Sequence, residues 1–188
     1  MNIFKFALFV SLLGLSTFSF SQEKTEGETE SKKPKKETKY TEVINTDSLK
    51  ASELLKRAVN WVKLENARYE KTNGVTTSDK AECFVKFVVK PKELNPECDY
   101  TGTISLKVVI DCKDNKYRYT VSHIKHLSKS GKTTGGSIDN VTPECGSMIM
   151  SDVIWKKVRG EGIKSANIVI NDLKEAMKLD SKLPKDEW

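Results

Sequence analysis

The sequence has few of the residues that usually carry catalysis or bind metal ions. Its 188 residues include two histidines, His123 and His126, and four cysteines, none of which form a Cys-x-x-Cys pair. Residues three apart on a strand point to opposite faces, so the two histidines cannot converge on one metal ion. No Gly-x-Ser-x-Gly element marks a nucleophile. The sequence therefore predicts no catalytic residue, no metal site and no cofactor.

Long apolar runs are also missing, except at the start of the chain. The run Phe6–Leu15 is too short to span a bilayer, which requires roughly 20 residues. Lys5 precedes the run, and Ser19 and Ser21 fit the small-residue positions of a signal-peptidase site. We therefore predict a signal peptide over residues 1–21, export to the periplasm or secretion, and no transmembrane segment after signal removal.

Large apolar residues are absent from residues 22–39 as well. This stretch consists almost entirely of Glu, Lys, Thr, Ser, Gly and Pro, so burial cannot offset the entropy cost of ordering it. We predict that it is a disordered, charged tether.

The excess of positive charge is mild. The formal net charge is +6, and loss of Lys5 with the signal peptide leaves about +5 on the mature chain. Such a charge favours contact with anionic lipid or glycan. An exported protein seldom meets nucleic acid, so we expect no nucleic-acid partner. The expected partner is an envelope protein, a glycan or an amphipathic ligand.

Residues 40–183 are enough for one domain, and their apolar patterns change between the periods of strands and helices. Tyr40–Thr46 is predicted to be a strand, followed by a helix over Leu49–Asn66 that Asp47 or Ser48 caps. The later predictions are strands at Arg68–Thr77, Glu82–Lys90, Thr101–Cys112 and Lys116–Ile124, a flexible loop at 126–147, a short helix or strand at Met148–Val158, and a helix at Glu161–Leu179. The expected fold class is α+β, with an antiparallel twisted sheet of four to five strands and two helices packed on one face, in the order β-α-β-β-β-β-α.

One predicted hairpin can be aligned residue by residue. Asp114 and Asn115 suit a two-residue turn, because both tolerate positive φ. The turn then pairs Lys113 with Lys116, Cys112 with Tyr117, Ile110 with Tyr119, and Val108 with Val121. The apolar faces of the two strands coincide in this register, as a buried face requires.

Export would allow the four cysteines to form disulfide bonds. Cys83 and Cys112 lie on apolar strand faces, and they can lie opposite each other if their strands pair antiparallel. Cys98 and Cys145 fall near the other end of that strand pair. We therefore favour the bonds Cys83–Cys112 and Cys98–Cys145. The alternatives are buried free thiols at Cys83 and Cys112, or a Cys83–Cys98 bond.

Aromatic side chains provide the candidate ligand groove. It would be lined by Trp61, Tyr117, Tyr119 and Trp155. Aromatic residues at such spacings belong more often to the core, which is the alternative. His123 falls on the strand face of Tyr119 and Val121, so we predict a histidine in the core or at its edge.

Several of these features together resemble a known family. They are the signal peptide, the strand Tyr40–Thr46, the helix pattern Glu53-Leu54-x-x-Arg57-Ala58-x-x-Trp61 and the hairpin strand that begins Lys116-Tyr117-Arg118-Tyr119-Thr120. The chain resembles a bacterial exported domain of unknown function with a TATA-binding-protein-like fold. The resemblance implies a curved antiparallel sheet with two helices on one face. It implies no catalytic residue and no DNA binding, because fold does not fix function.

Three functions fit these observations. The first is a non-catalytic cell-envelope module that binds a partner or an amphipathic ligand, and we favour it because no catalytic pattern is present. The second is a hydrolase-type enzyme whose site forms only in three dimensions, for example around His123 with an acid and a polar nucleophile. The third is a structural component of an envelope assembly, which would expose an apolar patch.

Overall fold

The structure is a computed structural model that describes residues 37–91 and 99–178. These residues all belong to one compact unit of the chain. The predicted signal peptide and most of the predicted tether lie outside the described residues. The elements, in chain order, are β1 (Tyr40–Asn45), α1 (Ala51–Lys63), β2 (Glu70–Thr76), β3 (Lys80–Val89), β4 (Gly102–Lys113), β5 (Lys116–Ser128), β6 (Gly136–Ser137) and α2 (Asp152–Lys178).

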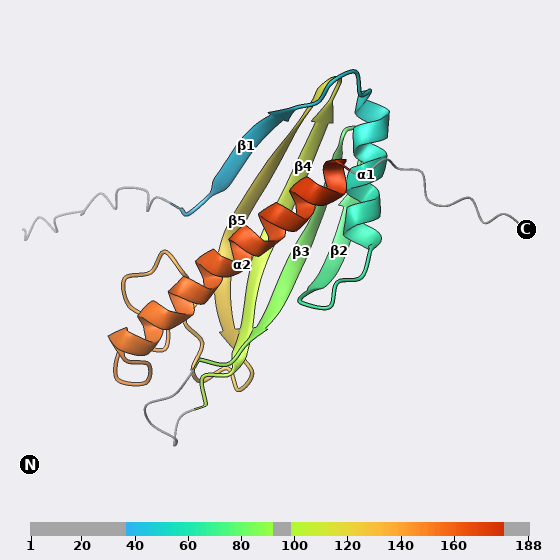
Figure 1. Cartoon of the computed structure of the whole chain (residues 1–188). Helices are drawn as coiled ribbons and strands as arrows, with labels where there is room; N and C mark the ends of the chain where they lie inside the picture. The colour runs from blue at the N-terminus through green and yellow to red at the C-terminus, as the bar shows by residue number, and fades with distance from the viewer. Residues whose placement is uncertain (1–36, 92–98, 179–188) are drawn as a thin grey trace, which may run out of the picture. The chain divides into compact units, whose positions relative to one another are not determined.

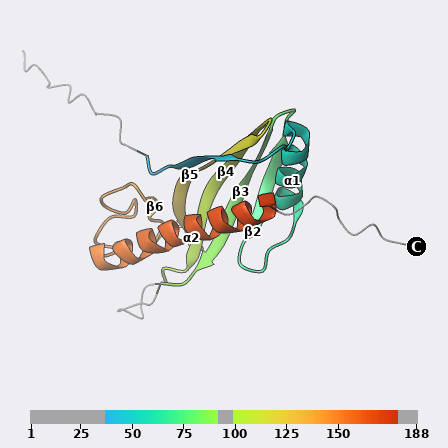
Figure 2. The same cartoon turned by 45° about the horizontal axis from the view of Figure 1, so that its top comes forward.

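The strands form one antiparallel sheet in the order β1-β5-β4-β3-β2, and the short β6 pairs with β5. Both helices lie on the same face of this sheet (Figures 1 and 2). Helix α1 packs against β3 and β4, and α2 crosses the sheet and packs against β5, β4 and β3. The predicted fold class is confirmed, with β6 as an additional strand.

The β4–β5 hairpin has the predicted register. Its turn brings Lys113 opposite Lys116, and the pairing continues through Ile110 with Tyr119 and Val108 with Val121. Of the two turn residues, Asn115 has a positive φ, at 60°, and Asp114 does not.

The core fills the space between the sheet and the two helices. Alternate residues of β3 and β4 are buried, as expected for strands with one covered face. From the helices come the buried residues Leu54, Ala58 and Trp61 of α1 and Ile154, Trp155, Val158, Ala166, Val169, Ile170, Leu173 and Met177 of α2.

Helix α1 is capped by a distant part of the chain. Its N-cap residue, Lys50, makes no side-chain capping hydrogen bond, and Ser48 lies in the left-handed region with φ 58°. The Asp114 carboxylate instead accepts a hydrogen bond from the Ala51 N–H at 2.8 Å. The prediction of Asp47 or Ser48 as the cap was therefore wrong, because the cap comes from the β4–β5 turn.

A bulge in β5 changes which of its residues face the core. Lys107 pairs with Ser122, whereas Ser105 pairs with Lys125, and the φ angle of His123 is 54°. The extra residue reverses the side-chain alternation. His126 is consequently fully buried and His123 is exposed. The prediction that His123 continues the core face of Tyr119 was therefore wrong.

The last third of the domain is more regular than predicted. Strand β5 continues to Ser128, β6 pairs back onto it, and Thr133 and Ile138 are buried, all within the predicted loop 126–147. Helix α2 begins at Asp152, so a single helix replaces the two separate elements expected at Met148–Val158 and Glu161–Leu179.

The cysteine prediction requires a correction. Cys83 pairs with Val108, and Cys112 lies four residues farther along β4, where its N–H donates to the Asp79 carbonyl at 2.8 Å. Four strand residues extend about 13 Å, which is too far for a disulfide bond. The Cys83–Cys112 bond was wrong, and the alternative of two buried free thiols holds. Burial raises the pKa of both thiols to about 11. Cys145 is a free thiol in the structure as well. Cys98 lies outside the described residues, so the Cys98–Cys145 bond stays a prediction.

Candidate functional site: the open face of the sheet

In the described part of the chain, no helix packs on the second face of the sheet, which we call the open face (Figures 1 and 2). Since strand side chains alternate, the open face consists of the residues between the buried ones. In β3 these are every second residue from Lys80 to Val88, and in β4 every second residue from Thr103 to Lys113. Strands β1, β2 and β5 contribute the residues that continue these rows across the sheet.

Positive charge predominates on the open face. Its basic residues are Lys80, Lys86, Lys107, Lys113, Lys116, Arg118 and Lys125, and its acidic residues are Glu70, Glu82 and Asp111. Two of the acids are already paired, because Lys107 lies 3.3 Å from Glu82 and Arg118 lies 2.9 Å from Asp111. The other five lysines have no ion-pair partner within residues 37–91 and 99–178. The face therefore attracts anions.

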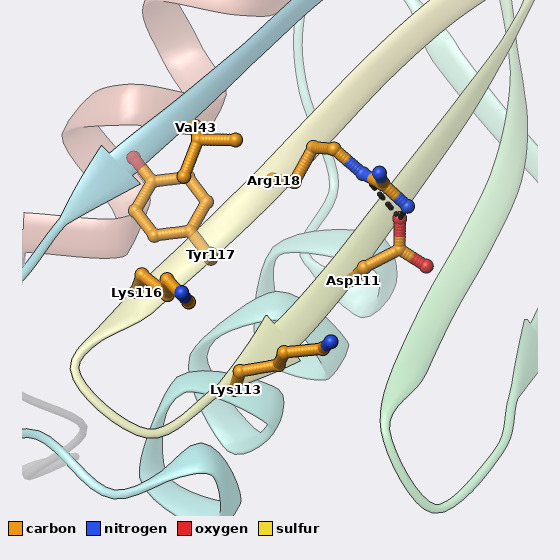
Figure 3. Close-up of a pocket in the computed structure, with 6 residues that line it drawn as sticks. All are labelled: Val43, Asp111, Lys113, Lys116, Tyr117 and Arg118. Carbon is orange, nitrogen blue, oxygen red and sulfur yellow. Dashed lines mark hydrogen bonds and ion pairs between the residues drawn. The ribbon is translucent and has the colours of Figure 1, made fainter.

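A small pocket lies at the end of the open face, next to the β4–β5 turn (Figure 3). Its volume is about 210 Å³, and its lining is Val43, Asp111, Lys113, Lys116, Tyr117 and Arg118. The Arg118 guanidinium donates two hydrogen bonds to one Asp111 oxygen, at 2.9 and 3.1 Å, which fix its orientation. The pocket thus carries three cations and one carboxylate.

An aromatic ring lies in the middle of the open face. Phe84 pairs with Lys107 on one side and with Thr72 on the other. The ring is partly exposed, and the Lys107 ammonium lies 6.0 Å from its centroid. The open face therefore combines cations with apolar surface at its centre.

A second hollow, of about 510 Å³, lies between β1 and α2 on the helix side of the sheet. In it, the Tyr119 hydroxyl donates to Glu42 Oε2 at 2.6 Å, and Lys174 Nζ lies 2.6 Å from the same oxygen. The hydrogen bond from Lys174 lowers the pKa of Glu42, and burial raises the pKa of Tyr119. Glu42 therefore stays ionised and Tyr119 protonated, so this cluster joins β1 to α2 and does not activate a nucleophile.

The four predicted groove aromatics do not form one groove. Trp61 and Trp155 are core side chains with 3% and 2% of their surface exposed. Tyr117 and Tyr119 are also mostly buried, but Tyr117 contributes to the pocket beside the turn and Tyr119 to the hollow beside α2.

The hydrolase hypothesis required a polar nucleophile and an acid beside His123. Ser122 Oγ lies 2.9 Å from His123 Nδ1, and Glu37 Oε1 lies 3.4 Å from the same nitrogen. In a serine triad the nucleophile and the acid contact different ring nitrogens. Because Ser122 is also buried, this arrangement cannot work as such a triad.

Sequence reasoning missed the basic residues of the open face as a site. The alternation that places Ile104 to Cys112 in the core also places Lys107, Asp111 and Lys113 on the opposite side. A count of charges at these outward positions would have found the face. The pocket would have remained hidden, because Val43 reaches it through the pairing of β1 with β5.

Comparison with known families accounts for this architecture. The family model described as a domain of unknown function (DUF4468) with TBP-like fold matches residues 40–126. The chain contains a DUF4468 domain. The prediction of a domain of unknown function with a TBP-like fold is confirmed. The match covers β1 to the buried His126 of β5, so the DUF4468 domain includes most of the open face, and β6 and α2 follow it in the chain.

Two solved structures are similar to the chain. The first is a TBP-like protein from Parabacteroides distasonis ATCC 8503, with 14% identity and a TM-score of 0.54, over 79% of this chain and 97% of that chain. The second is a DUF4468 family protein from Bacteroides ovatus ATCC 8483, with 8% identity and a TM-score of 0.49, over 78% of this chain and 90% of that chain. The first likeness shows the fold alone. No curated protein matches the chain.

Proposed function

We propose that the protein is an exported, non-catalytic binding module of the cell envelope that binds an anionic glycan through the open face of its sheet. The observation that carries this proposal is the charge of the open face, where seven basic side chains stand against three acidic ones. Two of the acids are already paired with basic neighbours, so most of the positive charge is available to a ligand.

The distribution of these groups favours a glycan as the ligand. The unpaired lysines are spread over β3, β4 and β5, which suits a polymer with repeated carboxylates. Between them, Ser105 and Thr120 supply hydroxyls that can exchange hydrogen bonds with sugar hydroxyls. The partly exposed ring of Phe84 offers apolar surface to the C–H face of a sugar.

The N-terminal sequence supports export. The apolar run Phe6–Leu15, followed by Ser19 and Ser21, has the pattern of a cleaved signal peptide. No helix among the described residues is long and apolar enough to cross a membrane. N-terminal sequencing of the protein isolated from its cells should begin at Gln22, and an uncleaved Met1 would contradict export by this route.

A charge-removal experiment tests the site. The open-face variant replaces Lys86, Lys113 and Lys116 with Gln, and the control replaces Lys156, Lys157 and Arg159, exposed residues of α2, in the same way. Both variants lose the same formal charge. We expect affinity for a short oligogalacturonate at low salt to fall by about tenfold in the open-face variant and by less than about twofold in the control.

Three outcomes would overturn the glycan proposal. Equal losses in the two variants would show attraction by net charge without a site. Absence of oligogalacturonate binding by the wild-type protein would exclude an anionic glycan as the ligand. Binding to phosphatidylglycerol vesicles in place of the oligogalacturonate would assign the face to lipid.

The other two functions stay predictions with their own tests. Hydrolysis of the oligogalacturonate by the wild-type protein would favour the enzyme. Assembly of the purified mature chain into large oligomers would favour the structural component. A monomer that binds the oligogalacturonate and leaves it intact supports the binding module.

A further inference from the structure

The two edges of the sheet differ in regularity. Strand β2 is irregular, because its register against β3 shifts between Thr72 and Val75, and the φ angle of Asn73 is 53°. Bulges of this kind prevent an edge from pairing with further strands. Strand β1, at the other edge, pairs with β5 over its whole length without a shift, from Tyr40 to Asn45. No strand of the described part of the chain pairs with the outer side of β1.

The hydrogen-bond pattern indicates which backbone groups of β1 point outward. The Thr46 N–H donates to the Asn115 carbonyl at 2.8 Å, so these two residues form a hydrogen-bonded pair at the end of the ladder. Such pairs alternate along antiparallel strands. Thr41, Val43 and Asn45 therefore direct their N–H and C=O groups away from β5. They form a regular template for another strand.

The helix side of this edge opens into the hollow beside α2. The wall formed by α2 includes Asn167 and Asn171, one turn apart, and then Lys174. Both asparagines are exposed, and their amides have no hydrogen-bond partner among the described residues. A strand added to β1 would direct every second side chain toward these amides.

The charges of the hollow favour an acidic segment. Its charged groups are Lys39, Glu42 and Lys174. Glu42 is paired with Lys174 at 2.6 Å, whereas Lys39 has no ion-pair partner in the part of the chain that the structure describes. The hollow thus has one excess positive charge and two amides that can donate to carboxylates.

We propose that an extended segment of a partner protein, with acidic side chains at alternate positions, adds to β1 as an antiparallel strand and places those side chains in the hollow beside α2. Strand addition at an open edge gains affinity from backbone hydrogen bonds and specificity from alternate side chains. This site uses the edge of β1 and the helix side of the sheet, whereas the proposed glycan would bind the open face.

A second copy of the chain fits the edge less well than an acidic segment. Antiparallel pairing of two β1 strands would place both copies of α2 on the same side of the joined sheet. It would also place two copies of the excess positive charge of the hollow on that same side. Like charges on one side oppose this dimer.

The decisive variant is Val43→Pro, with Val43→Thr as its control. Proline removes one outward N–H, and prolines are tolerated on edge strands where the N–H faces solvent. Threonine changes the side chain and keeps the N–H. Peptides selected from a displayed random library on the full mature chain should bind Val43→Pro about tenfold more weakly than wild type, and Val43→Thr within about twofold. The selected peptides should carry Asp or Glu at alternate positions.

A second measurement does not depend on these substitutions. In the wild-type protein alone, hydrogen exchange should be fast at the amides of Thr41 and Val43 and slow at that of Ile44. A selected peptide should slow exchange at Thr41 and Val43. The proposal would be overturned if the selected peptides bound Val43→Pro as tightly as the wild type, or if the library yielded no binding peptide. Protection of Thr41 and Val43 in the free chain would also overturn it, because the edge would then be covered by the chain itself or by a second copy.

Discussion

Lys113 and Lys116 lie directly opposite each other where β4 and β5 leave their turn. Like charges at opposed positions of antiparallel strands are destabilising. The sheet retains this pair at the end of the open face that carries the pocket, beside Arg118. Local rules of stability are broken most often at functional sites, so the pair agrees with the binding role that we propose for the open face.

Reversal of one of these charges should improve stability and weaken binding. In Lys116→Glu the opposed pair becomes attractive, and we expect the free energy of unfolding to rise by about 0.5 kcal/mol. Urea denaturation measures this change. Affinity for the oligogalacturonate should fall in the same variant.

Lys156→Glu, at an exposed position of α2, is the control for net charge. It should leave both the stability and the affinity close to those of the wild type. A Lys116→Glu protein that is less stable than the wild type would contradict the interpretation of the lysine pair.

The stability gained from the cap on α1 should depend on the hydrogen-bond acceptor of Asp114 and not on its charge. The Asp114 carboxylate accepts from the Ala51 N–H at 2.8 Å. Its replacement in Asp114→Ala should cost about 1 kcal/mol of folding free energy, as for other caps. Asp114→Asn keeps an acceptor and tolerates turn geometry, so it should retain most of the stability. Equal losses in both variants would show that the hydrogen bond is not a cap.

His126 should make stability depend on pH. Burial lowers the pKa of His126 below its usual 6.5, and its Nδ1 accepts a hydrogen bond from the Gly135 N–H at 3.1 Å. The unfolded chain takes up the proton near pH 6.5, whereas the folded chain takes it up only at lower pH. The contribution of neutral His126 to stability is therefore complete above about pH 6.5, the unfolded-state pKa. It is lost as the pH falls from there toward the lower folded-state pKa.

Urea denaturation at several pH values between about 7.5 and 5 checks this prediction. In His126→Asn, stability should fall less steeply with decreasing pH than in the wild type. The control is His123→Asn, at an exposed position whose positive φ asparagine tolerates. It should keep the wild-type slope. Equal slopes for all three proteins would contradict the role of His126.

Cys145 is the partner that we predict for Cys98. The Cys145 N–H donates to the Thr134 carbonyl at 3.0 Å, and the neighbouring Thr133 hydroxyl donates to the carbonyl of Asp99 at 2.9 Å. Asp99 directly follows Cys98 in the chain. Peptide mapping under non-reducing conditions should find a Cys98–Cys145 bond in the protein isolated from its cells, with Cys83 and Cys112 reduced. A bond that includes Cys83 or Cys112 would contradict both the pairing and the register of β3.

The fold followed from the sequence where period and turn chemistry agreed. The β4–β5 register was predictable because Asp114 and Asn115 suit a two-residue turn and the apolar faces on either side coincide. The β3–β4 register was not, because the residues between Val89 and Gly102 are too many to fix the pairing, and Cys83 consequently lies opposite Val108.

Other features of the fold depend on tertiary contacts that no local sequence pattern predicts. The bulge at His123 inserts one residue without an apolar signal, so His126 was not expected in the core. Gly160 and Gly162 interrupt the helical pattern, yet Gly162 lets α2 approach Ile124 and Ile138, which would lie only 3.3 and 3.0 Å from an added Cβ. The pocket at the end of the open face was equally hidden, because Val43 reaches it only through the pairing of β1 with β5.

Amide chemical shifts recorded during titration with the oligogalacturonate test whether the open face is the binding surface. The perturbed amides should lie in β3, β4 and β5, around Phe84, Lys113 and Arg118. Perturbations confined to α2, or spread evenly over the surface, would contradict this role of the open face.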